Sequence, residues 1–249
     1  MYQEIEFETL LRRARRTAFG RAFEFDTILE ASDSVGAFQE AVPVFDYEGM
    51  RTDWWHRCEA GEPDVSWPGK VPYFAQSSGT SGAPSKMIPV TRAMNRAIRR
   101  AGIKQLYSLA AFHLPEETFE SEVLILGGST QLERRGSYYV GDLSGISARE
   151  LPSWFQHFYR PGAEVAAQRD WKEKLEEITR RAAHWDVGIV TGVPSWVQLL
   201  FGRLCDHYGV ETVHEIWPNL SVYVHGGVAF GPYRRSLERY LGRPVTCIE

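Results

Sequence analysis

The chain has 249 residues, 43% hydrophobic and 13% aromatic, which is enough for the core of one large or two small domains and too much for a disordered protein. A formal net charge of −4 argues against nucleic acid or an anionic membrane as the main partner. The N-terminus lacks a signal-peptide core, and no run approaches the roughly 18 apolar residues of a membrane span. We therefore expect a soluble, cytoplasmic protein with no membrane and no nucleic-acid partner.

The three cysteines suggest no site. Cys58, Cys205 and Cys247 are far apart, odd in number and in no Cys-x-x-Cys pattern. These features argue against a metal centre or a disulfide framework. We expect three buried, reduced thiols.

The first half of the chain predicts mostly helices. Apolar spacing indicates an amphipathic helix over residues 4–18 that stops at Gly20, and another helix around residues 51–62. A long helix is predicted over residues 91–113, with Thr91 as its N-cap. Residues 121–130 are typical of a buried strand that opens into a glycine turn.

The second half predicts a parallel sheet. After a helix over residues 170–185, strands at 186–192, 219–227 and 243–249 alternate with two helices between them. This alternation indicates parallel strands with helices covering the sheet, that is, an α/β fold. In such sheets ligands gather at the carboxyl ends of strands. The glycines at such ends are Gly127, Gly128, Gly192, Gly226 and Gly227.

The stretch "YFAQSSGTSGAPSKMIPVT" contains a hydroxyl-rich loop, residues 77–86, with a cation at its end. A phosphate cradle needs convergent backbone N–H groups, hydroxyls and a positive charge. The residues that supply them are Ser77, Ser78, Gly79, Thr80, Ser81, Gly82 and Lys86. The alternative is a flexible linker, which the apolar flanks on both sides disfavour. The order of residues also differs from a Walker P-loop.

These features resemble a known family. "TAFGRAF", "AVPVFDYE", "SSGTSGAPSKMIPVT", "TGVPSWVQLL", "EIWPNLSVYVHGG" and "PYRRSLERYLG" follow one another from about Phe7 to Glu249. In this order they resemble the auxin-responsive family of acyl-acid amido synthetases, of the bacterial type, within the adenylate-forming superfamily. The resemblance implies part of the large domain of that fold. Residues 1–70 would be its helical part, and residues 71–249 would be part of its ATP- and acyl-binding α/β core.

The resemblance implies a two-step ligase reaction. A carboxylic acid attacks the α-phosphorus of ATP, accompanied by Mg²⁺, and gives an acyl-adenylate; an amino acid then attacks the acyl carbon. The partners are these small molecules, and we expect a monomer, although the sequence does not determine the oligomeric state.

The resemblance also implies roles for particular residues. Ser77, Ser78 and Thr80 would contact the ATP phosphates, Gly79, Ser81 and Gly82 would shape the loop, and Lys86 would add charge. Gly226, Gly227 and Val228 would carry the adenine ring. Val193 and Trp196 are candidates for the acyl pocket, with ordinary helix–sheet packing as the alternative for Trp196. His225 adjoins the adenine turn, and a structural role is favoured over a catalytic one. No catalytic residue and no metal ligand is assigned.

Family members are more than twice as long as this chain. Their Ser-Glu motif and their C-terminal lid domain have no counterpart before Glu249. We therefore expect an N-terminal fragment that is incomplete for catalysis and whose last strand leaves an exposed sheet edge. Two other functions stay open: an acyl-thioester ligase of the acyl-CoA type, and a non-catalytic nucleotide-binding module.

Overall fold

The computed structural model describes residues 2–77 and 85–249. The chain divides into two compact units. The first unit comprises Met1–Arg96 and Glu133–Gly141, and the second comprises Ala97–Leu132 and Asp142–Glu249. The boundary that the sequence suggests at residue 70, within one domain, stays a prediction. Within the described ranges, no helix is both long and apolar enough to cross a bilayer.

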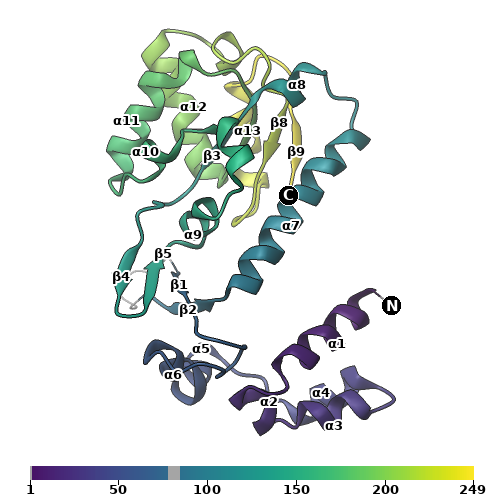
Figure 1. The fold of residues 1–249 in the computed structure, drawn as a ribbon. Helices are drawn as coiled ribbons and strands as arrows, with labels where there is room; N and C mark the ends of the chain where they lie inside the picture. Colours follow the sequence, from purple (N-terminus) through teal and green to yellow (C-terminus); the bar gives the residue numbers. More distant parts are fainter. Residues whose placement is uncertain (1, 78–84) are drawn as a thin grey trace. The chain divides into compact units, whose positions relative to one another are not determined.

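The first unit begins with four helices, which are the purple helices of Figure 1. They are α1 (Tyr2–Ala14), α2 (Ala18–Ala22), α3 (Phe25–Glu30) and α4 (Ser34–Ala41). The helix predicted over residues 4–18 is therefore confirmed as far as Ala14 and wrong beyond it, and Gly20 lies inside α2 instead of ending a helix.

Thr17 explains this break. Its side chain donates to the carbonyl of Ala14 at 2.6 Å and accepts from the backbone N–H of Gly20 at 3.0 Å, so it closes α1 and caps α2. A Cβ at Gly20 would lie 2.2 Å from the Ala14 carbonyl oxygen, which leaves room only for glycine.

A second helical segment follows, as predicted around residues 51–62. It consists of α5 (Tyr47–Met50), the π-helical turn η1 (Arg51–Trp55) and α6 (His56–Glu59). It packs against a small core that includes Cys58, Phe74 and Val140. This core joins the segment to the sheet of the first unit.

That sheet has four strands in the order β2-β1-β5-β4. β1 (Tyr73–Gln76) pairs antiparallel with β2 (Met87–Val90) and parallel with β5 (Tyr138–Gly141), which pairs with β4 (Glu133–Arg135). The sequence analysis predicted none of these strands. The pairing of β1 with β2 matters for function, because Gln76 opposite Met87 brings the two ends of the hydroxyl-rich loop together.

The second unit contains the predicted parallel sheet. Its order is β6-β3-β7-β8-β9, and all four pairs of neighbours are parallel. The strands are β3 (Glu122–Leu126), β6 (Tyr159–Arg160), β7 (Val187–Gly192), β8 (Val222–Val224) and β9 (Thr246–Ile248). Since β6 and β7 follow β3 on opposite sides, the strand order reverses between β3 and β7. This reversal is the switch point at which open α/β sheets bind ligands.

Helices and short turns connect the strands. The helices are α7 (Arg92–Ser108), which starts in the first unit, α8 (Glu117–Glu120), α9 (Leu143–Arg149), α10 (Ala163–Ala166), α11 (Trp171–Arg181), α12 (Pro194–Tyr208) and α13 (Gly231–Arg239). The 3-10 turns are η2 (Leu109–Ala111), η3 (Ser153–His157), η4 (Ala182–His184) and η5 (Val213–Glu215). Thr91 caps α7 as predicted, because its hydroxyl accepts from the N–H of Met94 at 3.1 Å.

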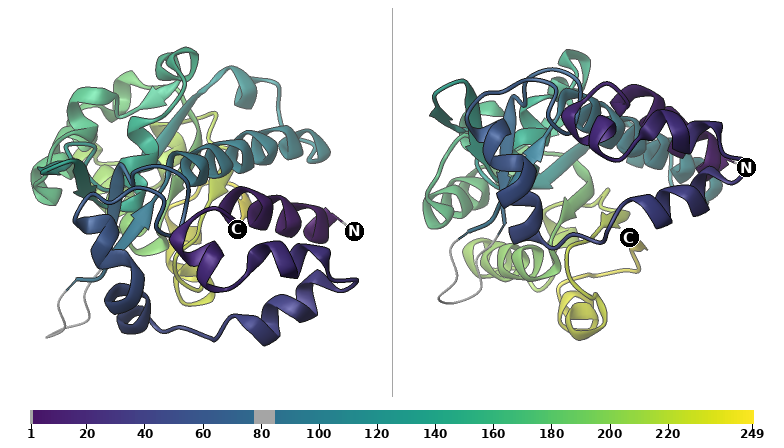
Figure 2. Two further views of the ribbon diagram at one scale, coloured as in Figure 1. Left: turned by 60° about the horizontal axis from the view of Figure 1, so that its bottom comes forward. Right: turned by 90° about the horizontal axis from the view of Figure 1, so that it is seen from below.

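Both faces of this sheet are buried. Leu124 and Val190 point into a core with α11, α12 and α13, whereas Val123 and Ile189 point into a core on the opposite face. Alternation of this kind is what parallel strands covered on both sides require. α11 and α12 lie side by side over the first face (Figures 1 and 2).

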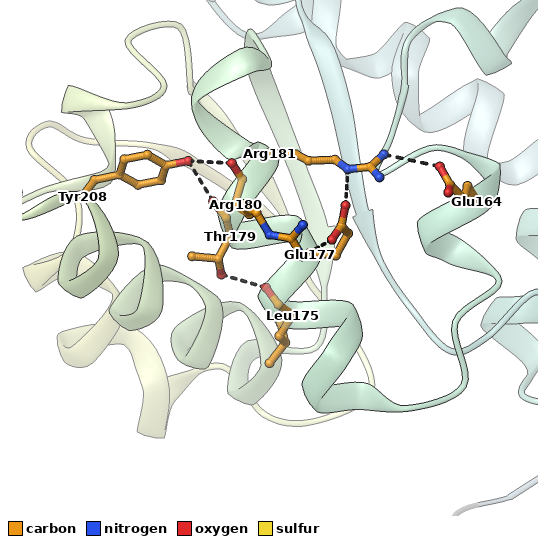
Figure 3. Close-up of polar contacts among 7 residues, drawn as sticks. All are labelled: Glu164, Leu175, Glu177, Thr179, Arg180, Arg181 and Tyr208. Carbon is orange, nitrogen blue, oxygen red and sulfur yellow. Dashed lines mark hydrogen bonds and ion pairs between the residues drawn. The ribbon is translucent and has the colours of Figure 1, made fainter.

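A polar cluster at the C-terminal end of α11 fixes these two helices (Figure 3). The hydroxyl of Tyr208, on α12, donates to the carbonyl of Thr179 at 2.8 Å. The carboxylate of Glu177 is hydrogen-bonded to the guanidinium groups of Arg180 and Arg181. Arg181 also lies 3.5 Å from Glu164 of α10, so the cluster joins three helices.

The expectation of three buried thiols is wrong for one of them. Cys58 and Cys205 are buried, whereas Cys247 is exposed. Cys247 lies on β9, which has β8 as its only paired neighbour among the described strands, so less structure covers it. Burial raises the pKa of the Cys58 thiol, which keeps it protonated.

Lys174 is the buried cation of the second unit, with 3% of its surface exposed. Its Nζ donates to the carbonyl of Ala166 at 3.1 Å and to that of Gly127 at 3.3 Å. Burial lowers the pKa of Lys174, and the nearby Asp142 carboxylate partly opposes this. Through its bond to the Gly127 carbonyl, the side chain therefore holds the turn that follows β3.

Replacing Trp217 by alanine is expected to lower the free energy of unfolding by about 3–5 kcal/mol, because the cavity would be large and the core fills it poorly. Trp217 is fully buried, and its Nε1 donates to the carbonyl of Ala182 at 2.9 Å. Urea unfolding followed by circular dichroism measures the change. Leu199→Ala, at a side chain that is 46% exposed, is the matched control. A loss no larger than that of the control would contradict the packing described.

Replacing Lys174 by methionine is expected to change how stability depends on pH. Because burial lowers its folded-state pKa, the unfolded chain binds more protons at this site below the ordinary pKa of about 10.4. The penalty of the buried charge is therefore present at lower pH and disappears as the pH rises through this window. Wild type should gain stability relative to Lys174→Met as the pH rises toward this ordinary pKa. Urea titrations of both proteins test this, and a constant or falling difference would contradict it.

Candidate functional site

The glycine turns of the second unit lie where the sequence analysis placed them, at carboxyl ends of parallel strands. Gly127 follows β3, Gly192 ends β7, and Gly226 comes two residues after the end of β8. A Cβ at Gly192 would lie 3.1 Å from the Leu126 carbonyl oxygen, so β3 and β7 approach closely at the switch point. The hydroxyl of Tyr223 donates to the Gly192 carbonyl at 3.0 Å and joins β8 to this edge.

The turn after β3 is packed tightly against the start of α9. The N–H of Gly128 donates to the Ser144 hydroxyl at 2.9 Å. A Cβ at Gly128 would lie 2.4 Å from the Asp142 carboxylate, and one at Gly145 would lie 2.1 Å from the Ser129 carbonyl oxygen. Lys174 also donates to the Gly127 carbonyl, so both α9 and the Lys174 side chain hold the turn. The turn is therefore closely packed where the parallel strands end.

The turn after β8 contains a glycine that its backbone conformation requires. Gly227 has a φ of +83°, a conformation that side chains other than glycine rarely adopt. A Cβ at Gly226 would meet nothing within 4 Å, and Val228 is 42% exposed. The nearest atom to a Cβ at Gly227 is Cγ2 of Val193, at 3.6 Å. The structure therefore brings the predicted adenine turn and one predicted acyl-pocket residue together.

His225 belongs to an aromatic stack. Its ring lies 4.4 Å from that of Phe230 at an interplanar angle of 15°, and the guanidinium of Arg234 lies 5.4 Å from the Phe230 centroid. Its Nδ1 is buried and has no hydrogen-bond partner among the described residues. The stack favours the structural role over a catalytic one.

Trp196 packs against another tryptophan. Its ring lies 4.4 Å from that of Trp171, at the margin of the core under α11 and α12. This contact is packing between two helices, α11 and α12, rather than the helix–sheet packing considered as the alternative to an acyl-pocket role. The assignment of Trp196 to the pocket stays a prediction.

The hydroxyl-rich loop belongs to the first unit, and the structure describes only its ends. Ser78, Gly79, Thr80, Ser81 and Gly82 lie outside the described residues. The N–H of Ser77 donates to the carbonyl of Lys86 at 3.0 Å, and the N–H of Lys86 donates to the Ser77 hydroxyl at 3.2 Å. These two bonds extend the β1–β2 pairing by one residue and close the base of the loop.

Lys86 is an exposed cation at this base. Its Nζ lies 5.1 Å from the centroid of the Tyr47 ring, and no described carboxylate forms an ion pair with it. The charge is therefore free to meet an anion. The sequence analysis missed Tyr47, as it missed Lys174, because both act through residues far away in the chain.

The described residues offer no ready site for the Mg²⁺ that the resemblance implies. No group of three or more His, Cys, Asp or Glu side chains converges among them. No step of the chemistry is assigned to a metal held by this part of the chain.

Comparison with solved structures supports the fold. An acyl acid amido synthetase, AtGH3.15 in complex with 2,4-DB, superposes with a TM-score of 0.71 at 19% identity and covers 96% of this chain and 50% of its own. An open conformation of 2-hydroxyisobutyryl-CoA ligase in complex with 2-HIB-AMP and CoA gives a TM-score of 0.57 at 15% identity, over 97% of this chain and 50% of its own. This chain thus spans about half the length of these proteins. No curated protein matches it.

These likenesses show the partial large domain of the adenylate-forming fold, as the motifs implied. The sequence itself matches the GH3 family N-terminal domain over residues 2–126 and 99–245, which is nearly all of the chain. The chain is therefore a member of the auxin-responsive GH3 family.

Proposed function

We propose that this chain is the nucleotide- and acid-binding part of an ATP-dependent acyl-acid amido synthetase. The observation that supports this most directly is the hairpin of β1 and β2. Its ladder brings Ser77 and Lys86 together at the base of a loop rich in hydroxyls and glycine. A free ammonium at that point suits the triphosphate of ATP, whose charge must be balanced for the α-phosphorus to accept a nucleophile.

Each predicted residue then has a defined task. Ser77, Ser78 and Thr80 bind the phosphates, and Lys86 adds positive charge. Gly226 and Gly227 let the backbone approach the adenine ring, next to Val193. The acid is activated as its acyl-adenylate, and an amino acid then forms the amide. Mg²⁺ would accompany ATP and balance part of the phosphate charge.

The second candidate is a ligase that transfers the acyl group to the thiol of CoA. It is supported by the shared fold with a CoA ligase and differs only in the second step. A non-catalytic nucleotide-binding module is the third. The family membership favours the amido synthetase over both. We also propose that the protein is cytoplasmic and monomeric.

The reaction class can be tested with the protein expressed from its complete gene. It should catalyse acid-dependent exchange of labelled pyrophosphate into ATP with at least one acid from a broad panel of carboxylic acids. Product analysis with amino acids and with CoA then distinguishes the amide from the thioester. Exchange with none of the acids, together with intact ATP binding, would leave only the non-catalytic module.

Thr80→Ala is expected to weaken ATP binding by roughly 1.5–3 kcal/mol, the value of a hydrogen bond to a charged group. Isothermal titration calorimetry with this chain measures the loss. Ser85→Ala, in the same segment but with no assigned role, is the matched control and should bind as wild type does. Equal affinities of wild type and Thr80→Ala would remove Thr80 from the site.

A further inference from the structure

Tyr47 connects the first helical segment to the base of the hydroxyl-rich loop. It is the first residue of α5, forty positions before Met87. Its hydroxyl accepts from the N–H of Met87 at 2.8 Å. β2 is an edge strand, so this N–H points away from β1 and would otherwise have no partner in the sheet. Tyr47 therefore supplies the hydrogen-bond acceptor for the outward-facing N–H of Met87, the first residue of β2.

The same side chain lies under the ammonium of Lys86. The 5.1 Å between Nζ and the ring centroid is within the range of a cation–π interaction. Without an acidic partner among the described residues, the Tyr47 ring is the contact that orients this cation. A ring attracts the ammonium without neutralising its charge, whereas a carboxylate would compete with phosphate.

The ring is itself held in place. Asp46 caps α5 by accepting from the N–H of Gly49 at 2.8 Å. The ring of Trp55 lies 6.0 Å from that of Tyr47, at 61°. Trp55 in turn packs against the buried cluster of Cys58 and its neighbours. Through Trp55, the Tyr47 ring that contacts the ammonium is thus connected to the core of the first unit.

We propose that Tyr47 is a positioning residue whose ring holds the Lys86 ammonium at the base of the loop, ready for the phosphates of ATP. This inference rests on the proposed function, since it gives Lys86 its ligand. A lysine side chain is flexible, and orienting it beforehand reduces the entropy that binding costs. Tyr47 contributes to phosphate affinity through Lys86, without contact with the ligand.

A double-mutant cycle tests this. ATP binding is measured by calorimetry for wild type, Tyr47→Leu, Tyr47→Phe, Lys86→Met and the double variant Tyr47→Leu/Lys86→Met. Tyr47→Leu should weaken binding roughly two- to fivefold, as expected of an exposed cation–π contact. Tyr47→Phe, which retains the ring, should stay within about twofold of wild type on the same scale. In the Lys86→Met background the effect of Tyr47→Leu should disappear.

Controls separate this role from a general effect on folding. The thermal unfolding midpoint is recorded for every variant, and Tyr107→Leu, at a tyrosine that is 77% exposed, is the matched control. A loss from Tyr47→Leu that persists unchanged in the Lys86→Met background would show that Tyr47 acts on the fold, and would overturn the inference. So would Tyr47→Phe binding as weakly as Tyr47→Leu.

The outcomes also distinguish the inference from the function on which it depends. If Lys86→Met weakens ATP binding but Tyr47→Leu does not, the inference fails and the phosphate site stands. If Lys86→Met binds ATP as wild type does, Lys86 has no part in the site and the inference fails, whereas the proposed function stands. If wild type itself does not bind ATP, the proposed function fails first.

Discussion

The second unit depends on close backbone approach where the parallel strands end. At the switch point between β3 and β7, the chain after β3 is compressed between the start of α9 and the ammonium of Lys174, with glycine wherever a side chain would collide. A buried cation is costly unless its hydrogen bonds are satisfied, and here two carbonyls provide for it. The result is a turn, at the carboxyl ends of the strands, whose shape is set by the backbone.

The main feature of the first unit is an exposed cation, Lys86. Its sheet is small and mixed, and its predicted phosphate-binding loop is closed by Ser77 and Lys86. Here the tertiary contact of Tyr47 determines where the cation lies. The second unit thus contains a turn fixed by close packing, and the first unit contains a cation that lies against an aromatic ring.

The parallel sheet could be predicted because its strands are continuous apolar runs separated by capped helices. Gly209, which ends α12 with a φ of +67°, is an example of such a local signal. The β4–β5 hairpin was missed because Glu133–Arg135 is polar and exposed and shows no apolar alternation, although Gly136 and Ser137 form a two-residue turn typical of hairpins. β6 has two residues, too few for a periodicity. The candidate loop was found from its composition, whereas Tyr47 and Lys174 act across 39 and 47 positions, a separation that a sequence pattern does not record.

The placement of β4 and β5 has a consequence for how the protein is made. They belong to the first unit but come after β3 of the second, so the chain crosses between units at residues 96, 132 and 141. β1 has only β2 beside it until β5 has been synthesised, more than sixty residues later. During synthesis, the sheet of the first unit therefore stays incomplete until after the first strand of the second unit has been made. Neither unit corresponds to a continuous segment that could be expressed alone.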